Sequence, residues 1–139
     1  MVKKTIEYFD LRQICRSGQC FRMTMEDEYR CSIIAGERYL RMEQHGREVQ
    51  FFCGEEEFQD FWSAYFDLHN DYGSYIQQAN PNDAYLNQAI CFGSGMRILR
   101  QDLWETIVSF LISQQNHIGR IRKCIENICV AYGEKRMNH

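Results

Sequence analysis

The sequence lacks several features that would place the protein in a special class. It has no apolar run close to the roughly 20 residues that a membrane-spanning helix needs. The N-terminus, MVKKTIEYFD, lacks the apolar segment of a signal peptide. There is also no internal repeat and no low-complexity linker. We therefore expect a cytoplasmic protein without a membrane partner, built as one domain or as one domain and part of another.

The seven cysteines lack the spacing of a metal site or of a disulfide framework. No CxxC pair occurs, and the four histidines do not fall at ligand-like spacings from the cysteines. Without a secretory signal the cysteines are expected to be reduced thiols. The sequence predicts neither a metal nor another cofactor.

The chain also lacks the positive charge typical of nonspecific nucleic-acid binding, since its net charge is −3. The charge is unevenly spread, however. Residues 55–83 hold seven acidic side chains and no Lys or Arg, whereas residues 95–139 hold seven Lys or Arg against four acidic residues. A DNA duplex would meet the C-terminal part and avoid the acidic middle. A solvated acidic face and an ordinary basic helix fit the same counts.

The first half of the sequence predicts a twisted antiparallel sheet over residues 5–53. Short runs rich in aromatic and β-branched residues recur there, separated by tight polar or glycine-containing turns. The expected strands are residues 5–9, 20–25, 29–35, 39–44 and 49–53.

Helices are expected after the sheet. In residues 55–66 the aromatic side chains fall on one helical stripe, which is most simply a face that covers the sheet. Asn80 and Pro81 form a typical helix start and predict a second covering helix over residues 82–91.

Two further helices are expected near the C-terminus, over residues 102–113 and 118–132. Asp102 is the expected N-cap of the first, with Glu105 completing an acidic capping box. That helix is apolar on more than one side, so it should be largely buried. The pattern predicts an α+β domain at residues 1–95, followed by the start of an all-α domain at residues 96–139.

Function is indicated most clearly by the junction between these last two helices. An apolar helix leads into Ser-Gln-Gln-Asn-His at residues 113–117, and Arg120 lies in the first turns of the next helix. Such side chains suit insertion into a duplex and hydrogen bonding to base edges. A polar inter-helix loop with a surface arginine is the alternative.

Four motifs resemble those of the DNA glycosylases that excise 8-oxoguanine, which belong to the helix-hairpin-helix superfamily. Their common order along the chain argues against coincidence. They are SGQCFR at 17–22, the aromatic helix with its following Asp-Leu at 67–68, RILRQD at 97–102 and the helix pair at 109–121. The resemblance covers most of the chain. It implies a TATA-binding-protein-like sheet domain, followed by the first two helices of a helix-hairpin-helix domain.

The resemblance implies that the main-chain carbonyl of Gly18 accepts a hydrogen bond from N7–H of 8-oxoguanine. Guanine carries a bare acceptor at N7, so the undamaged base would leave this carbonyl unsatisfied, at a cost of about 1–3 kcal/mol. Phe21 is expected to pack beneath the same loop, and Cys20 to be a core residue and not a nucleophile. The residues alone also allow Gly18 simply to turn the chain.

The resemblance assigns roles to the junction as well. Gln115 stands where the family uses Asn to fill the space left by the flipped base, and Arg120 stands where the family reads the opposite cytosine. Asn116 belongs to the same motif, and His117 is expected to touch a phosphate or to cap the helix. The implied partner is double-stranded DNA with 8-oxoguanine opposite cytosine.

In the family, a Lys amine and an Asp of a later hairpin carry out the chemistry, and no lysine of this sequence lies in such a motif. We therefore expect the N-terminal portion of a glycosylase and abasic-site lyase, inactive alone and without catalytic residues of its own. The alternatives are a non-catalytic DNA- or protein-binding module and a gene fragment without function. Apolar faces on the last two helices predict self-association. The expected setting is the nucleoid of a bacterium or archaeon.

Overall fold

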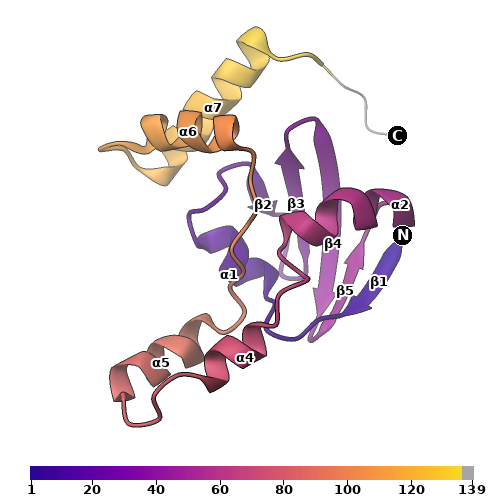
Figure 1. Cartoon of the computed structure of the whole chain (residues 1–139). Coiled ribbons are helices and arrows are strands. Elements are labelled where there is room, and N and C mark those ends of the chain that lie inside the picture. The colour runs from indigo at the N-terminus through magenta and orange to yellow at the C-terminus, as the bar shows by residue number, and fades with distance from the viewer. Residues whose placement is uncertain (136–139) are drawn as a thin grey trace.

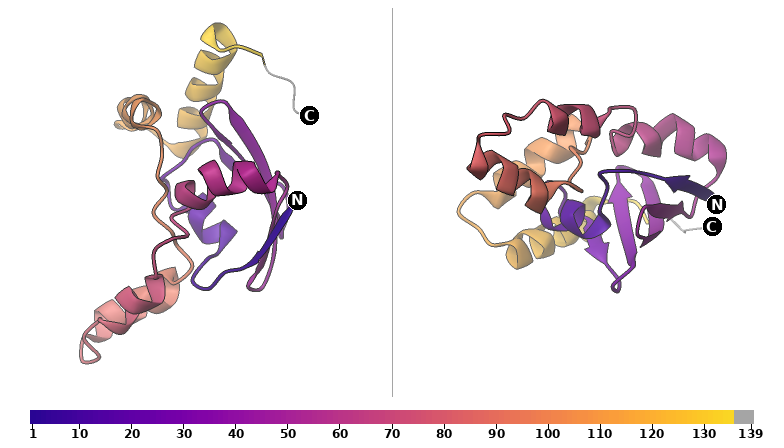
Figure 2. Two further views of the ribbon diagram at one scale, coloured as in Figure 1. Left: turned by 45° about the vertical axis from the view of Figure 1, so that its right-hand side comes forward. Right: turned by 90° about the horizontal axis from the view of Figure 1, so that it is seen from below.

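The computed structural model describes residues 1–135. Its centre is a curved five-stranded antiparallel sheet, and two helical arms extend from it at opposite ends (Figures 1 and 2). The strands lie in the order β1-β5-β4-β3-β2. They are β1 (Val2–Thr5), β2 (Met23–Met25), β3 (Arg30–Ala35), β4 (Arg38–His45) and β5 (Glu48–Phe51).

The hydrophobic core lies between one face of the sheet and two helical segments. Alternate strand residues such as Met23, Leu40 and Phe51 are fully buried on that face, as the two-residue period of a strand requires. Helix α1 (Leu11–Arg16) covers part of the face. A continuous helical segment covers the rest, formed by α2 (Glu55–Glu57), the π-helical turn η1 (Phe58–Trp62) and α3 (Ser63–Tyr65). The prediction that the aromatic stripe covers the sheet is therefore confirmed.

The predicted strand at residues 5–9 is wrong. β1 ends at Thr5, and the chain then turns through Tyr8, which has a φ of 52°, into α1. Helix α1 was not predicted, because six residues are too few to establish a helical period. The Asp10 side chain begins it by accepting hydrogen bonds from the main-chain nitrogens of Arg12 and Gln13.

The predicted helix over 82–91 is displaced, and its expected position on the sheet is wrong. Helix α5 (Ala84–Gly93) begins after Asp83, whose side chain accepts from the main-chain nitrogen of Leu86. The Asn80 side chain instead bonds the nitrogen of Asn82 within the preceding turn. None of the α5 residues is buried, and the helix projects from the sheet beside α4 (Tyr72–Gln77), which was not predicted (Figure 1).

Helices α6 (Leu103–Ser113) and α7 (Ile118–Tyr132) lie close to their predicted positions and form the second arm. Asp102 caps α6 as predicted, since its carboxylate accepts from the nitrogen of Glu105. The expected burial of α6 is wrong, because Trp104 is 72% exposed and Phe110 is 62% exposed. No helix within residues 1–135 is long and apolar enough to cross a bilayer. The last four residues of the predicted 96–139 unit lie outside the described part.

Candidate nucleic-acid interface

The loop between α1 and β2 presents Gly18 at the surface. Gly18 has a φ of +77°, a conformation that L side chains rarely adopt. Among residues 1–135, no hydrogen bond reaches its carbonyl oxygen. Phe21, three residues further on, is half-buried. The loop thus offers a main-chain acceptor without a partner among the described residues, and a half-buried aromatic ring follows three residues later.

Gln19 ties this loop to the segment that leads into α6. Its side-chain Nε2 donates to the carbonyl of Arg97 at 2.9 Å, and its Oε1 accepts from the nitrogen of Leu99 at 3.0 Å. The Gln101 side chain donates in turn to the carbonyl of Gln19 at 2.7 Å. Three hydrogen bonds therefore hold SGQCFR against RILRQD, two motifs about 80 residues apart in sequence.

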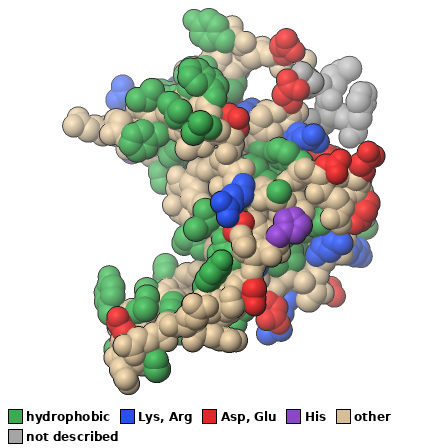
Figure 3. Space-filling model, viewed as in Figure 1, with side chains coloured by type: hydrophobic (Ala, Val, Ile, Leu, Met, Phe, Trp, Pro, Cys, Tyr) green, Lys and Arg blue, Asp and Glu red, His purple; other side chains and the backbone are tan. Residues whose placement is uncertain are grey.

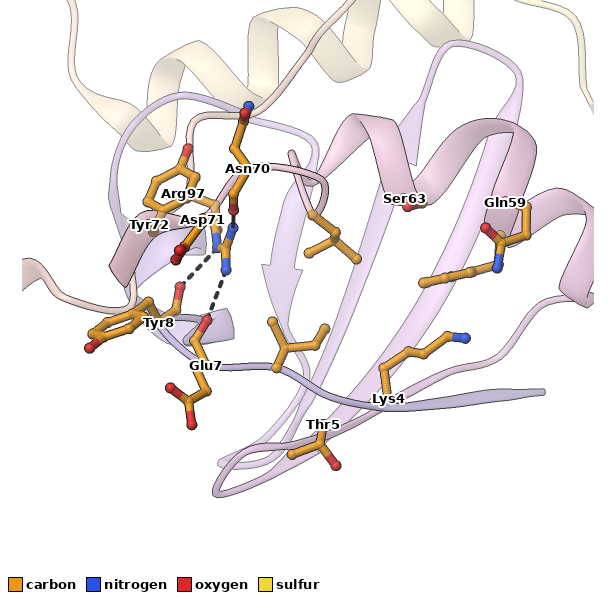
Figure 4. Close-up of a pocket in the computed structure, with 13 residues that line it drawn as sticks. Lys4, Thr5, Glu7, Tyr8, Gln59, Ser63, Asn70, Asp71, Tyr72 and Arg97 are labelled. Carbon is orange, nitrogen blue, oxygen red and sulfur yellow. Dashed lines mark hydrogen bonds between the residues drawn. The ribbon is translucent and has the colours of Figure 1, made fainter. Parts of the chain in front are cut away.

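Arg97 anchors that segment to the sheet domain. Its guanidinium donates to the main-chain carbonyls of Glu7, Tyr8, Asp67 and Asn70 at 2.8–3.2 Å. Figure 4 shows the bonds to Glu7, Tyr8 and Asn70. Burial lowers the pKa of this arginine, although the side chain remains a cation at neutral pH. An open cavity of about 520 Å³ lies beside it, between the end of β1 and the segment before α4. The arginine thus cross-links its own segment to two others, residues 7–8 and residues 67–70.

Asp67 completes this anchor with a positive φ of 54°. Its carboxylate accepts from Asn70 at 2.8 Å, from Tyr72 at 2.9 Å and from Arg100 at 3.0 Å. Burial alone would raise the pKa of Asp67, but the hydrogen bonds and the Arg100 charge together hold it below its ordinary value.

The turn between α6 and α7 holds the second group of predicted residues. Gln115 has a φ of 49°, unusual for a non-glycine residue, and its side chain is exposed. Asn116 uses its amide within the turn: it donates to the carbonyl of Ile112 and accepts from the nitrogen of His117. His117 caps α7 by accepting from the nitrogen of Arg120. The Arg120 side chain is exposed and has no partner among the described residues.

Three hydrogen bonds connect this helix pair to the sheet domain. The Glu105 carboxylate accepts from Arg22 at 3.4 Å and from the nitrogen of Gly36 at 3.1 Å, so it does not complete the predicted capping box. Arg122 of α7 donates to the carbonyl of Met23 at 3.2 Å. The loop of Gly18 and the junction of Arg120 are therefore held on one framework, although no hydrogen bond within residues 1–135 joins them directly.

Cys20 is the cysteine of the Gly18 loop, and it is buried. All seven are free thiols. Burial raises the pKa of Cys20, whose sulfur accepts from the Tyr65 hydroxyl at 3.8 Å, so its prediction as a core residue is confirmed. Among the residues that the structure describes, no cluster of three or more His, Cys, Asp or Glu could hold a metal ion.

Hydrophobic side chains lie on the surface of both helical arms. Figure 3 shows them over α6 and α5, on either side of a hollowed edge of the molecule. On α6 the exposed residues are Leu103, Trp104, Ile107, Phe110 and Leu111. The sequence prediction of apolar faces holds for α6. On α7, Ile121 and Ile125 are buried, but Ile128 is 43% exposed. A patch of this kind commonly marks an interaction surface.

Sequence reasoning missed three residues that organise the site: Gln19, Gln101 and Arg122. The first two lie in motifs that the sequence analysis singled out, but their partners are distant in sequence. No periodicity or local spacing reveals such contacts, so only the fold could assign them.

Comparisons with known proteins agree with this architecture. Residues 1–107 match the family model described as the N-terminal domain of 8-oxoguanine DNA glycosylase. The apo structure of the Clostridium acetobutylicum 8-oxoguanine glycosylase/lyase is 39% identical, with a TM-score of 0.91. The alignment covers 97% of this chain and 47% of that one.

Two further relatives extend the comparison. The same clostridial enzyme, solved with double-stranded DNA containing cytosine opposite 8-oxoguanine, is 40% identical with a TM-score of 0.89 and covers 96% of this chain and 46% of that one. The N-glycosylase/DNA lyase of Saccharomyces cerevisiae is 44% identical over 39 residues, which are 28% of this chain and 10% of that protein. The chain thus spans about half the length of the solved relatives.

Proposed function

Since the chain belongs to the 8-oxoguanine DNA glycosylase family through its N-terminal domain, we propose that it supplies the lesion-reading part of a DNA glycosylase and abasic-site lyase. The proposed substrate is 8-oxoguanine opposite cytosine in double-stranded DNA. The observation that carries this proposal is the Gly18 carbonyl, an acceptor without a hydrogen-bond partner among residues 1–135, in an exposed loop that Gln19 holds in place.

Base chemistry explains why this acceptor suits the lesion. N7 of 8-oxoguanine carries a hydrogen, whereas N7 of guanine carries a lone pair. Once a base covers the loop and excludes water, the Gly18 carbonyl gains a hydrogen bond only from the oxidised base. Failure to satisfy a buried acceptor costs about 1–3 kcal/mol, which corresponds to a preference of about five- to 150-fold.

The α6–α7 junction supports a second contact with the duplex. Gln115 in the turn and Arg120 in the first turn of α7 are both exposed. We assign to Gln115 the space left by the flipped base, and to Arg120 the base edge of the opposite cytosine. Asn116 and His117 hold the turn in shape, and the amino end of α7 favours a nearby phosphate.

Catalytic chemistry is not assigned to any residue of these 139. Schiff-base formation on an abasic site needs a positioned amine, and no lysine lies in the Gly18 loop or in the α6–α7 junction. We propose that this polypeptide alone binds the lesion without excising it. The exposed face of α6 supports the further proposal that the isolated polypeptide self-associates.

Fluorescence anisotropy with labelled duplexes tests the binding proposal. We expect the wild-type chain to prefer 8-oxoguanine:cytosine over guanine:cytosine. The Arg120→Ala change should reduce the preference for cytosine opposite the lesion, because a guanidinium that reads one base edge contributes about 1–3 kcal/mol of discrimination. Arg47→Ala is the matched control, since Arg47 is exposed in the turn between β4 and β5 and pairs with Glu7.

Two results would oppose the proposal. Equal affinity of the wild-type chain for damaged and undamaged duplexes would remove the lesion-reading role. An equal loss opposite all four bases in Arg120→Ala would reduce Arg120 to a backbone contact. Borohydride trapping on an abasic duplex, run in parallel, should give no covalent adduct; an adduct would place a catalytic amine within the chain.

A further inference from the structure

We infer that Gln19 is a positioning residue, whose side-chain amide fixes the direction of the Gly18 carbonyl by fastening the loop between α1 and β2 to the segment before α6. This inference rests on the proposed reading of the base by Gly18. It assigns a specific task to a residue that does not itself contact DNA in the proposal.

The first argument is the geometry of the peptide unit. The Gly18 carbonyl and the Gln19 N–H belong to one planar group, so the orientation of one fixes the orientation of the other. The Gln19 N–H points to the hydroxyl oxygen of Ser17 at 3.4 Å, and that hydroxyl donates to the carbonyl of Ile14 at 2.7 Å. These two hydrogen bonds connect the Gly18–Gln19 peptide plane to the C-terminal end of α1.

The second argument is that the Gln19 side chain connects the loop to the segment before α6. A primary amide offers a donor and an acceptor in fixed relation, and Gln19 uses them on Arg97 and Leu99 as a neighbouring strand would. Gln101 adds a third bond to the carbonyl of Gln19 itself. Because Arg97 and Leu99 are buried, the segment that receives these bonds is well anchored.

The third argument is that Gly18 requires such restraint. A glycine at positive φ can exchange between backbone conformations more freely than any other residue. A methyl group at position 18 would have no atom within 4 Å outside the two neighbouring residues, so no side chain restrains Gly18 on that side. The direction of the Gly18 carbonyl must therefore be fixed by the neighbouring residues. Gln19 takes part in most of the hydrogen bonds that hold this loop.

The chain offers a matched control for a purely structural role. Gln13 of α1 makes the same pair of bonds to the chain just before this segment: its Nε2 donates to the carbonyl of Phe92 at 3.1 Å, and its Oε1 accepts from the nitrogen of Gly95 at 2.9 Å. Gln13→Glu removes the amide NH2 donor, as Gln19→Glu does, but it lies outside the Gly18 loop. The change costs Gln13 one donated hydrogen bond and Gln19 two. Both changes keep the size of the side chain.

The experiment compares the two variants by anisotropy and by thermal unfolding. The readout is the ratio of affinities for 8-oxoguanine:cytosine and guanine:cytosine duplexes. The Gln19 Nε2 donates to Ser17 Oγ at 3.0 Å as well as to the carbonyl of Arg97, so Gln19→Glu removes two donated hydrogen bonds. We expect it to lower this ratio at least about fivefold, the equivalent of one hydrogen bond or more, with little change in affinity for the undamaged duplex. Gln13→Glu should keep the wild-type ratio, even where both variants melt at the same lower temperature. Gln101→Glu, which loses the donor to the Gln19 carbonyl, should change the ratio in the same direction as Gln19→Glu.

The outcomes separate this inference from the proposed function. A wild-type preference that survives in both Gln19→Glu and Gln101→Glu overturns the inference and leaves the proposed function standing. An equal fall of the ratio in Gln13→Glu and Gln19→Glu also overturns it, since the role is then general stability. If the wild-type chain shows no preference, the proposed function fails and the inference fails with it.

Discussion

The guanidinium carbon of Arg97 lies 4.1 Å from the centre of the Tyr72 ring. The tyrosine hydroxyl donates to Asp67 at 2.9 Å and accepts from the nitrogen of Ile98 at 3.0 Å. The ring therefore covers the buried cation while its hydroxyl fixes the next residue of the same segment. This relationship stabilises the segment on which the Gly18 loop depends.

Replacement of Arg97 by Met should destabilise the whole chain. Four main-chain carbonyls lose their donor, and each acceptor left unsatisfied in a buried site costs about 1–3 kcal/mol. We expect the free energy of unfolding to fall by about 3 kcal/mol or more in urea denaturation. Arg100→Met is the control, because that side chain is 61% exposed and makes a single bond to Asp67. Equal stability of the two variants would contradict the anchoring role.

The Asp67 carboxylate should make stability depend on acid pH. Its pKa in the folded chain lies below the ordinary value of 3.8, so its contribution is complete well above pH 3.8 and is lost as the pH falls through the lower, folded pKa. The difference in unfolding free energy between the wild type and Asp67→Asn should therefore shrink toward acid. Asp60→Asn, on the exposed side of η1, serves as control. A difference that stays constant from pH 7 to acid would refute this account of Asp67.

Comparison of Gly18→Ala with Gly54→Ala distinguishes backbone strain from steric crowding by the added methyl group. Gly18→Ala and Gly54→Ala both place a methyl group where no atom lies within 4 Å, but only Gly18 has a positive φ, whereas Gly54 has a φ of −71°. We expect Gly18→Ala to lower the free energy of unfolding by about 1–2 kcal/mol, and Gly54→Ala to be neutral or slightly stabilising. Thermal unfolding of the two variants checks this. Two equally stable variants would mean that the loop does not hold Gly18 in its left-handed conformation.

The apolar face of α6 should drive association of the isolated polypeptide. Trp104 and Leu111 are 72% and 65% exposed, and burial of each such side chain is worth about 1.5–3 kcal/mol. Sedimentation velocity should show a concentration-dependent increase in size that Trp104→Glu weakens. Tyr132→Glu, a change at an 88% exposed residue near the end of α7, should leave association unchanged. A concentration-independent monomer would contradict the proposed self-association.

The sequence predicted the elements whose signals are local. Asp102 identified the start of α6, and the aromatic stripe of 55–66 correctly indicated the cover of the sheet. Helix α1 was not predicted because its six residues are too few to show a helical period. Helix α5 was expected on the sheet because its sequence pattern is partly apolar. Such a pattern does not reveal which surface, if any, the apolar face of the helix packs against.

Within the candidate site, the sequence predicted only those residues to which a family-like motif assigns a role. The resemblance pointed to Gly18 and Arg120, but it assigned no partners to Gln19, whose bonds reach residues about 80 positions away. Similarly, Glu105 was expected to cap its own helix, and it binds Arg22 and Gly36 instead. Contacts at such separation follow from the packing of the arms on the sheet, which has no local signature in the sequence.

Hydrogen exchange with and without a saturating 8-oxoguanine:cytosine duplex tests the central claim most directly. The account predicts slower exchange on DNA binding in two separate segments, residues 17–22 and residues 113–121, and no change in the acidic stretch 55–83. Protection confined to residues 55–83, or unchanged exchange in both predicted segments while the duplex is bound, would contradict the claim that the Gly18 loop and the α6–α7 junction form one DNA-reading surface.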